Sequence, residues 1–106
     1  MPQEIGNWLE LRKYLSNIGP DDLVVLDCYA TWCGPCKAIA PFFKELSEKY
    51  RDVHFLKADV EKVRELSSEF GVSSMPTFVF LKNLTALKKM EGADQSKLVS
   101  YIERYR

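Results

Sequence analysis

Apolar residues recur along the chain with two different periods, which divide it into helices and strands. Residues 8–18 carry apolar side chains at helical spacing, and Asn7 with Glu10 three residues later forms the pattern of a capping box. The turn-forming residues 19–22 end this helix. Residues 23–29 are a nearly continuous apolar run, which predicts a strand buried on both faces of a sheet.

The rest of the chain continues this alternation and closes with a hairpin and a helix. We predict elements at residues 36–50 (a helix that Pro41 should kink), 53–59 (a strand), 61–70 (a helix ending at Gly71), 77–82 and about 87–91 (a hairpin), and 94–102 (a helix capped by Asp94). A short leading strand around residues 2–5 is left open. The order predicts an α/β fold with a mixed sheet of five strands, or four without the leading one, flanked by four helices.

Composition then excludes several classes of protein. The 106 residues fit one domain, 1–106, and 46% hydrophobic with 28% charged residues is typical of a folded globular chain. Basic and acidic residues both number 15, so no overall positive field favours nucleic acid or an anionic membrane as partner. No run approaches the ~18 apolar residues of a membrane-spanning helix, and no signal peptide is visible, so we expect a cytoplasmic protein.

The candidate chemistry lies in Cys33-Gly34-Pro35-Cys36, between the strand at 23–29 and the next helix. A thiolate at the start of a helix faces unpaired backbone N–H groups and the positive end of the helix dipole, both of which lower its pKa. Gly34 is expected to allow a sharp turn, and Pro35 fits the first helical turn because it has no N–H to lose. We expect Cys33 to be the exposed, acidified nucleophile and Cys36 to be the shielded thiol that resolves the intermediate.

Three other readings of this cysteine pair remain open. A structural zinc site normally has four ligands, whereas the chain adds only a distant Cys28 and a single His54 to the pair. Covalent haem attachment needs His directly after the second cysteine, and Lys37 stands there. Two incidental cysteines would not need the glycine and proline between them. Reversible dithiol–disulfide chemistry is therefore the favoured interpretation.

The segment Trp32-Cys33-Gly34-Pro35-Cys36-Lys37, with 27–31 before it and Ser74-Met75-Pro76-Thr77 far downstream, resembles the thioredoxin family. The resemblance covers nearly the whole chain, from Leu23 through residues 92–94. It implies the thioredoxin fold and a general protein-disulfide reductase: Cys33 attacks a target disulfide, a mixed disulfide forms, and Cys36 displaces it.

The same resemblance implies the partners of such a reductase. A reductase of this family binds no cofactor, and the electrons that it carries come from NADPH through thioredoxin reductase. Oxidised proteins such as peroxiredoxins, ribonucleotide reductase and methionine sulfoxide reductase are the implied substrates. A monomer is expected, while nuclear import stays open.

Asp27 and Lys57 are the candidate supporting groups. A carboxyl group in an apolar strand should have a raised pKa, unless Asp27 reaches solvent at the strand end. The resemblance implies that Asp27 is the general base for Cys36, acting directly or through water. For Lys57 the pattern alone favours a solvated face, whereas the resemblance implies a partly buried partner of Asp27.

Pro76 should follow a trans peptide bond by base rates alone, since only about 5–6% of such bonds are cis. The resemblance implies a cis bond, with Met75 offering backbone hydrogen bonds to an extended substrate. The implied rim of the substrate groove consists of Trp32, Tyr29, Val72, Ser74, Gly92 and Ala93.

The chain also departs from the family pattern. Cys28 stands where an aromatic residue is usual, and we interpret it as an inert core residue. Leu84 and Thr85 replace the usual glycine of the hairpin turn, which argues against a type I′ turn and predicts a longer or bulged connection.

Two functions of other classes compete with the reductase. The first is a binding module that uses the fold as a scaffold. The second is an oxidase or isomerase of a secretory compartment, against which Pro35 argues because isomerases typically carry histidine there.

Overall fold

A computed structural model describes residues 1–106, with helices and strands in alternation. The elements are β1 (Gln3–Ile5), α1 (Trp8–Ser16), β2 (Val24–Tyr29), α2 (Gly34–Lys49), β3 (His54–Asp59), α3 (Glu65–Phe70), β4 (Thr77–Lys82), β5 (Thr85–Glu91) and α4 (Gln95–Tyr105). The leading strand that the sequence left open is present. No helix combines the length and apolar character that crossing a membrane requires.

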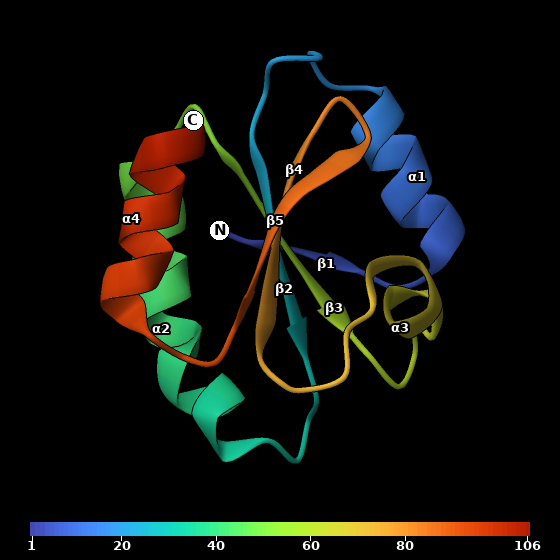
Figure 1. The fold of residues 1–106 in the computed structure, drawn as a ribbon, viewed down its shortest axis with the longest axis vertical. Helices are drawn as coiled ribbons and strands as arrows, with labels where there is room; N and C mark the ends of the chain where they lie inside the picture. Colours follow the sequence, from blue (N-terminus) through green and yellow to red (C-terminus); the bar gives the residue numbers. More distant parts are fainter.

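The strands form one mixed sheet in the order β1-β3-β2-β4-β5. β3 pairs in parallel with both β1 and β2, whereas β4 runs antiparallel to β2 and β5 antiparallel to β4. Helices α2 and α4 cover one face of the sheet, and α1 and α3 cover the other (Figure 1). The predicted α/β fold with a five-stranded mixed sheet and four helices is confirmed.

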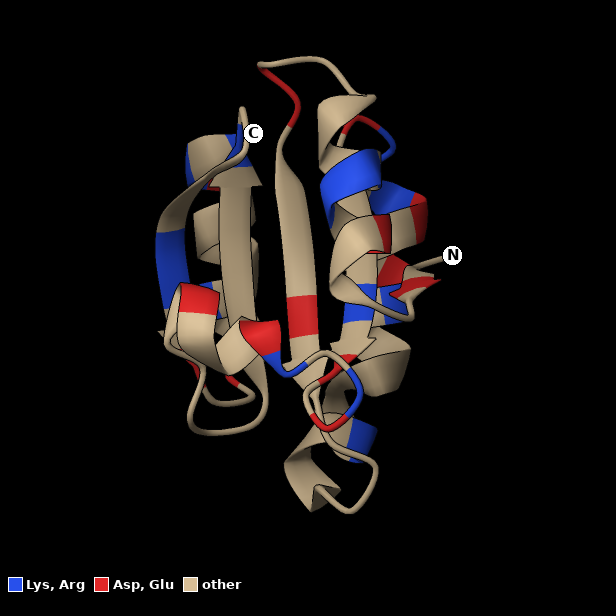
Figure 2. Ribbon diagram, turned by 90° about the vertical axis from the view of Figure 1, so that its right-hand side faces the viewer, with Lys and Arg blue, Asp and Glu red and all other residues tan.

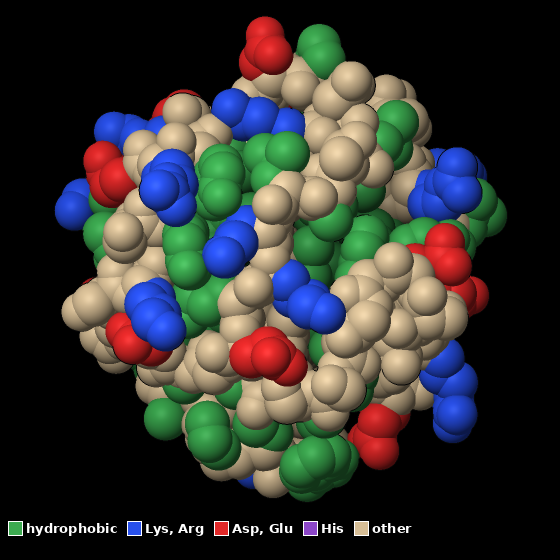
Figure 3. All heavy atoms as spheres, viewed as in Figure 1, with side chains coloured by type: hydrophobic (Ala, Val, Ile, Leu, Met, Phe, Trp, Pro, Cys, Tyr) green, Lys and Arg blue, Asp and Glu red, His purple; other side chains and the backbone are tan.

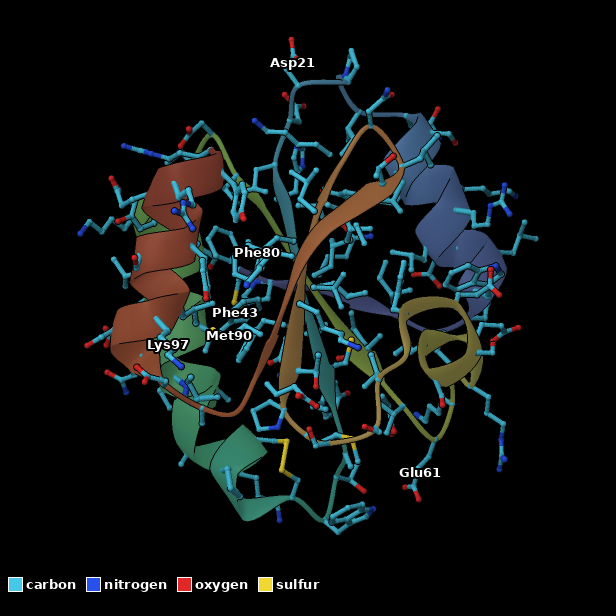
Figure 4. All side chains as sticks on the ribbon, viewed as in Figure 1. Asp21, Phe43, Glu61, Phe80, Met90 and Lys97 are labelled. Carbon is cyan, nitrogen blue, oxygen red and sulfur yellow. A yellow bond between two sulfur atoms is a disulfide. The ribbon has the colours of Figure 1, made fainter.

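Each face of the sheet buries its own apolar core. The core on the α2/α4 face includes Phe43, Phe78 and Phe80. The ring centres of Phe43 and Phe55 lie 5.2 Å apart. Figure 4 shows Phe43, Phe80 and Met90 between the sheet and these helices, while Asp21 and Glu61 lie at the periphery. The α1/α3 face buries a second set that includes Ile5, Leu11, Leu26, Leu56, Leu66 and Val79. Burial on both faces explains the continuous apolar run of β2.

Two predicted element boundaries were wrong, and both have a physical reason in the structure. α2 begins at Gly34 rather than Cys36, because Cys33 is its N-cap. α3 begins only at Glu65, since Asp59 takes the preceding residues into a turn: its side chain accepts from Glu61 N at 2.9 Å and its carbonyl from Val63 N at 2.8 Å. Such local side-chain bonds compete with helix formation.

The turn between β4 and β5 also contradicts the prediction. Asn83 and Leu84 form a two-residue connection with φ of 49° and 64°, the pattern of a type I′ turn. The twist of the strands therefore imposes a left-handed conformation without glycine. The predicted longer or bulged connection is absent, and the one register shift of the hairpin lies within its strands, between Phe80 and Leu81.

Candidate active site

The cysteine pair sits where β2 leads into α2, at the lower end of the molecule in Figure 4, which shows the disulfide as a yellow bond. Cys33 and Cys36 are joined in this disulfide, with Cα atoms 5.3 Å apart. As N-cap, Cys33 accepts a hydrogen bond at its Sγ from the backbone N of Cys36 at 3.2 Å. Its sulfur also lies 3.6 Å from the carbonyl oxygen of Met75. The helix start thus directs an N–H group at the first sulfur.

Exposure does not separate the two cysteines, contrary to the prediction that Cys33 is exposed and Cys36 shielded. Cys33 is 4% exposed and Cys36 5%. Both belong to a small buried cluster with Ala30, against which Tyr29, Val60 and Met75 pack. What distinguishes the two sulfurs is their position, since only Cys33 lies at the cap and receives the N–H that stabilises a thiolate.

Gly34 and Pro35 complete this helix start. Pro35 lies within the first turn of α2, as predicted. A Cβ on Gly34 would meet nothing within 4 Å, so the turn does not need glycine there. The expectation that Gly34 enables a sharp turn was therefore wrong. Its exposed position leaves open space beside the disulfide.

Asp27 is buried at 1% exposure, and its Oδ1 has no hydrogen-bond partner. Burial raises the pKa of Asp27 to about 7, an effect that the positive charge of Lys57 reduces and the negative charge of Glu4 increases. Asp27 and Cys36 line one cavity of about 260 Å³. The walls are largely apolar, but Asp27, Lys37 and Lys57 are among the lining residues, so a cavity of this size can hold water between the carboxyl group and the second sulfur.

Lys57 is half-buried and is the register partner of Asp27 on the neighbouring strand. It lines the same cavity but forms no ion pair with Asp27; its ammonium lies instead 4.9 Å from the centre of the Tyr29 ring. Lys57 thus acts on Asp27 through its charge, without a direct bond.

The loop that carries Met75 lies against the cysteine pair. The Met75–Pro76 peptide bond is cis, as the resemblance implied and base rates did not. Gly92 N donates a hydrogen bond to the Pro76 carbonyl at 2.9 Å, which holds the segment after β5 beside this loop. Ser74 donates to Glu91 at 2.9 Å. The structure therefore brings Ser74, Met75, Pro76, Gly92 and their neighbour Ala93 to one edge.

Trp32 is 65% exposed next to the disulfide. Hydrophobic side chains gather at this lower edge of the molecule in Figure 3. Val72 was expected on the same rim but is buried in the core of the α1/α3 face. Tyr29 packs, like Met75, against the cluster of Ala30, Cys33 and Cys36, and it also lines the cavity of Asp27.

Sequence reasoning missed two acidic residues of the site. Glu91 holds Ser74, and Glu4 accepts a hydrogen bond from the Tyr29 hydroxyl at 2.7 Å. Neither contact follows from a local motif, because each joins residues far apart in the chain. Cys28 is fully buried with a raised thiol pKa, caused first by burial, which fits an inert core residue. No cluster of three or more candidate ligands is placed to hold a metal ion.

The model of the thioredoxin family matches residues 8–104. The chain belongs to the thioredoxin family. It is 50% identical to thioredoxin of Homo sapiens, over 96% of both chains, and 44% identical to thioredoxin of Ophiophagus hannah, over 99% of both. The solved thioredoxin of Fasciola hepatica superposes with a TM-score of 0.93 at 34% identity, covering 98% of this chain and 99% of that one.

Family membership and the bonded cysteine pair make this thioredoxin-family chain a protein-disulfide oxidoreductase. Two other solved structures with this fold concern redox partners. One is a complex of thioredoxin f2 with ferredoxin:thioredoxin reductase, at 41% identity and a TM-score of 0.89, covering 96% of this chain and 92% of that one. The other concerns thiol resolution in a yeast mitochondrial 1-Cys peroxiredoxin, at 35% identity and a TM-score of 0.87, covering 97% and 94%.

Proposed function

We propose that Cys33 is the nucleophile and Cys36 the resolving thiol of this disulfide reductase. The Cys33 thiolate attacks one sulfur of a target disulfide, and the other target sulfur leaves as a thiolate. Cys36, once deprotonated, attacks Cys33 in the mixed disulfide. The target departs as a dithiol. The two electrons that it gained come from Cys33 and Cys36, which are left joined in a disulfide.

The observation that carries this assignment is the hydrogen bond from the backbone N of Cys36 to Sγ of Cys33. It stabilises negative charge on Cys33 alone, and the N-terminus of a helix adds the favourable end of its dipole. Cys36 lies one turn into the same helix and has no matching donor. The first sulfur is therefore the better thiolate and the second the one that needs a base.

Asp27 is the base that we assign to Cys36. The two groups line one cavity, and a pKa of about 7 allows Asp27 to exchange a proton near neutral pH. Water within the cavity would relay the proton between the carboxyl group and the sulfur. Lys57 would assist by stabilising the charged form of Asp27.

The target is proposed to bind along the edge formed by Trp32, Ser74, Met75, Pro76, Gly92 and Ala93. The carbonyl oxygen of Met75 already faces Cys33 at 3.6 Å, so an extended segment that lies beside Met75 brings its disulfide to the nucleophile. The exposed indole of Trp32 adds an apolar contact next to the sulfur.

Redox partners in general follow from the family, and the specific ones are proposals. We propose recharging by a thioredoxin reductase that draws on NADPH, with peroxiredoxins, ribonucleotide reductase and methionine sulfoxide reductase as substrates. The reductase complex and the peroxiredoxin study among structures of this fold support the first two kinds of partner. Figure 2 shows basic and acidic residues on helices, strands and connections alike.

Reduction of insulin disulfides with dithiothreitol tests the proposed function. The wild-type protein should accelerate insulin precipitation, and Cys33→Ser should abolish the effect. Cys28→Ser is the matched control, since Cys28 is buried on the other side of the sheet, and should keep the activity. A folded wild-type protein without turnover, or an active Cys33→Ser variant, would contradict the proposal.

A further inference from the structure

Three titratable residues stand side by side across β1, β3 and β2. Glu4 is the register partner of Lys57, and Lys57 is the register partner of Asp27. Register partners project from the same face of a sheet, here the one that α2 covers. The neighbouring Ile5 points to the opposite core, which confirms the face on which Glu4 lies. A lysine thus stands between an exposed and a buried carboxyl group.

Tyr29 connects β2 directly to the Glu4 end of this row. Its side chain lies two positions beyond Asp27 on the same face of β2, and its hydroxyl donates to Oε2 of Glu4 at 2.7 Å. The centre of the Tyr29 ring lies 4.9 Å from the Lys57 ammonium. Burial, followed by the hydrogen bond to Glu4, raises the pKa of Tyr29, so the phenol stays protonated and keeps donating. Tyr29 therefore fixes the Glu4 carboxylate beside Lys57.

Glu4 and Asp27 interact with the same positive charge. Lys57 forms no ion pair with either of them, so its field is shared between the two. Lys57 favours the ionised form of Asp27, whereas Glu4 disfavours it. Glu4 also lines a wider depression of about 620 Å³ together with Lys37 and Lys57, and these two lysines line the cavity of Asp27 as well. Glu4 thus lies at the outer side of that cavity.

We propose that Glu4, held in place by Tyr29, is a positioning residue that sets the pH at which Asp27 exchanges its proton with Cys36. This inference rests on the proposed role of Asp27 as the base for Cys36. Glu4 touches neither sulfur; it acts by opposing the field of Lys57 at Asp27.

The other groups around Asp27 are few. Cys36 and Lys37 face the cavity from α2, and the register partner of Asp27 on β4 is the apolar Phe78. Asp59 acts on Tyr29 rather than on Asp27 directly. Among the acidic residues, Glu4 is the one whose charge raises the pKa of Asp27.

The test is a titration of the Asp27 carboxyl carbon by ¹³C NMR in the oxidised protein, where neither thiol titrates. Removing the charge in Glu4→Gln should lower the midpoint of the Asp27 titration by about 0.5 pH unit. The shift is small because solvent around the exposed Glu4 screens its charge. Glu45→Gln is the matched control, because Glu45 is exposed on α2 without an ion pair, and should leave the midpoint unchanged. An unchanged or raised midpoint in Glu4→Gln would overturn the proposal.

Tyr29→Phe tests the positioning part. It keeps the ring beside Lys57 and removes only the hydrogen bond to Glu4. The released carboxylate should spend more time in solvent, so the Asp27 midpoint should move down, by less than in Glu4→Gln. A shift in Glu4→Gln with none in Tyr29→Phe would overturn the role of Tyr29.

The pH profile of insulin reduction separates this inference from the proposed function. If both hold, the acid limb of the profile moves down in Glu4→Gln together with the NMR midpoint. A moved midpoint with an unmoved profile would contradict the role of Asp27 as base while leaving its coupling to Glu4 intact. An unmoved midpoint in an active enzyme would contradict the coupling alone.

Discussion

Asp27 shows at the scale of one residue how the fold creates a reactive group. Its carboxyl group lies in an otherwise apolar strand with one oxygen that has no partner, so its charged form is expensive. The same burial that destabilises the charge places the pKa near neutrality. A carboxyl group that is costly to the folded state is thereby suited to accept a proton at physiological pH.

The free energy of unfolding should depend on pH because of this buried carboxyl group. The pKa of Asp27 is raised from 3.8 to about 7 on folding, so the folded state binds the proton more tightly than the unfolded state. The free energy of unfolding should therefore fall as the pH rises from about 4 to about 7 and stay level above that range. Asp27→Asn should remove this fall and be more stable than the wild type at pH 8, by at most about 4 kcal/mol.

Urea unfolding of both oxidised proteins at pH 4 and pH 8 measures this difference. At pH 4 it should be small, because Asp27 is protonated in the wild-type fold and resembles the amide. A variant that is less stable than the wild type at pH 8 would show that the Asp27 charge is well compensated, contrary to the structure.

At the scale of elements, the hairpin of β4 and β5 shows where local sequence signals fail. The strands follow from their apolar pattern, but the turn lacks glycine and still adopts positive φ at Asn83 and Leu84. Asparagine tolerates this conformation, whereas leucine is strained in it by about 1 kcal/mol. Strand twist and register, which are properties of the paired strands, override the preference of the single residue.

Leu84→Gly should therefore stabilise the protein by about 0.5 to 1 kcal/mol, since glycine adopts a positive φ without strain. Leu84 is 54% exposed, so little burial is lost. Leu87→Gly is the opposite control: Leu87 is 43% exposed on β5 without positive φ, and glycine there should destabilise. Thermal unfolding of both variants measures the two signs. A destabilised Leu84→Gly would mean that its apolar contacts outweigh the strain.

The sequence predicted the elements and the redox pair because both have local signatures. Helical and strand periods are visible within about ten residues, and Cys33-Gly34-Pro35-Cys36 is one short motif. The start of α3 was missed because an Asp59 turn competes with the helix. The equal burial of the two cysteines was missed because the Met75 loop that covers them is about forty residues away. Contacts between distant segments, such as Glu4 with Tyr29, carry no local signal.

At the scale of the whole molecule, the end of the sheet away from the disulfide has its own polar cluster. Tyr14 of α1 donates to Nδ1 of His54 at 2.7 Å, and Nε2 of His54 lies 3.1 Å from Oδ2 of Asp22. Because a carboxylate only accepts, Nε2 carries the proton of this bond. The cluster ties α1, the connection before β2 and the start of β3 together. The redox end is left free of this constraint.

Asp22 should contribute to stability in a pH-dependent way. The hydrogen bond from His54, and then that from Gly19 N, lower the pKa of Asp22 in the folded protein. A lowered pKa stabilises the fold above the unfolded value near 4 and loses this effect as the pH falls through the folded value. Asp22→Asn should thus reduce the free energy of unfolding at pH 7, with the difference shrinking below pH 4.

Asp21→Asn is the matched control for Asp22→Asn. Asp21 is the exposed neighbour and points outward in Figure 4, and its side chain forms no hydrogen bond or ion pair. Urea unfolding of the two variants at pH 7 and pH 3 measures the comparison. Equal effects of both substitutions would show that the loss comes from net charge rather than from the Tyr14–His54–Asp22 cluster.

The central claim is that Cys33 attacks the target disulfide and Cys36 resolves the intermediate. Trapping the mixed disulfide tests this claim most directly. In a Cys28→Ala background, Cys36→Ser incubated with insulin should accumulate a covalent adduct through Cys33, visible by non-reducing mass spectrometry and released by dithiothreitol. The corresponding Cys33→Ser variant should accumulate none. An adduct through Cys36 in the Cys33→Ser variant, or none through Cys33 in the Cys36→Ser variant, would contradict the assignment.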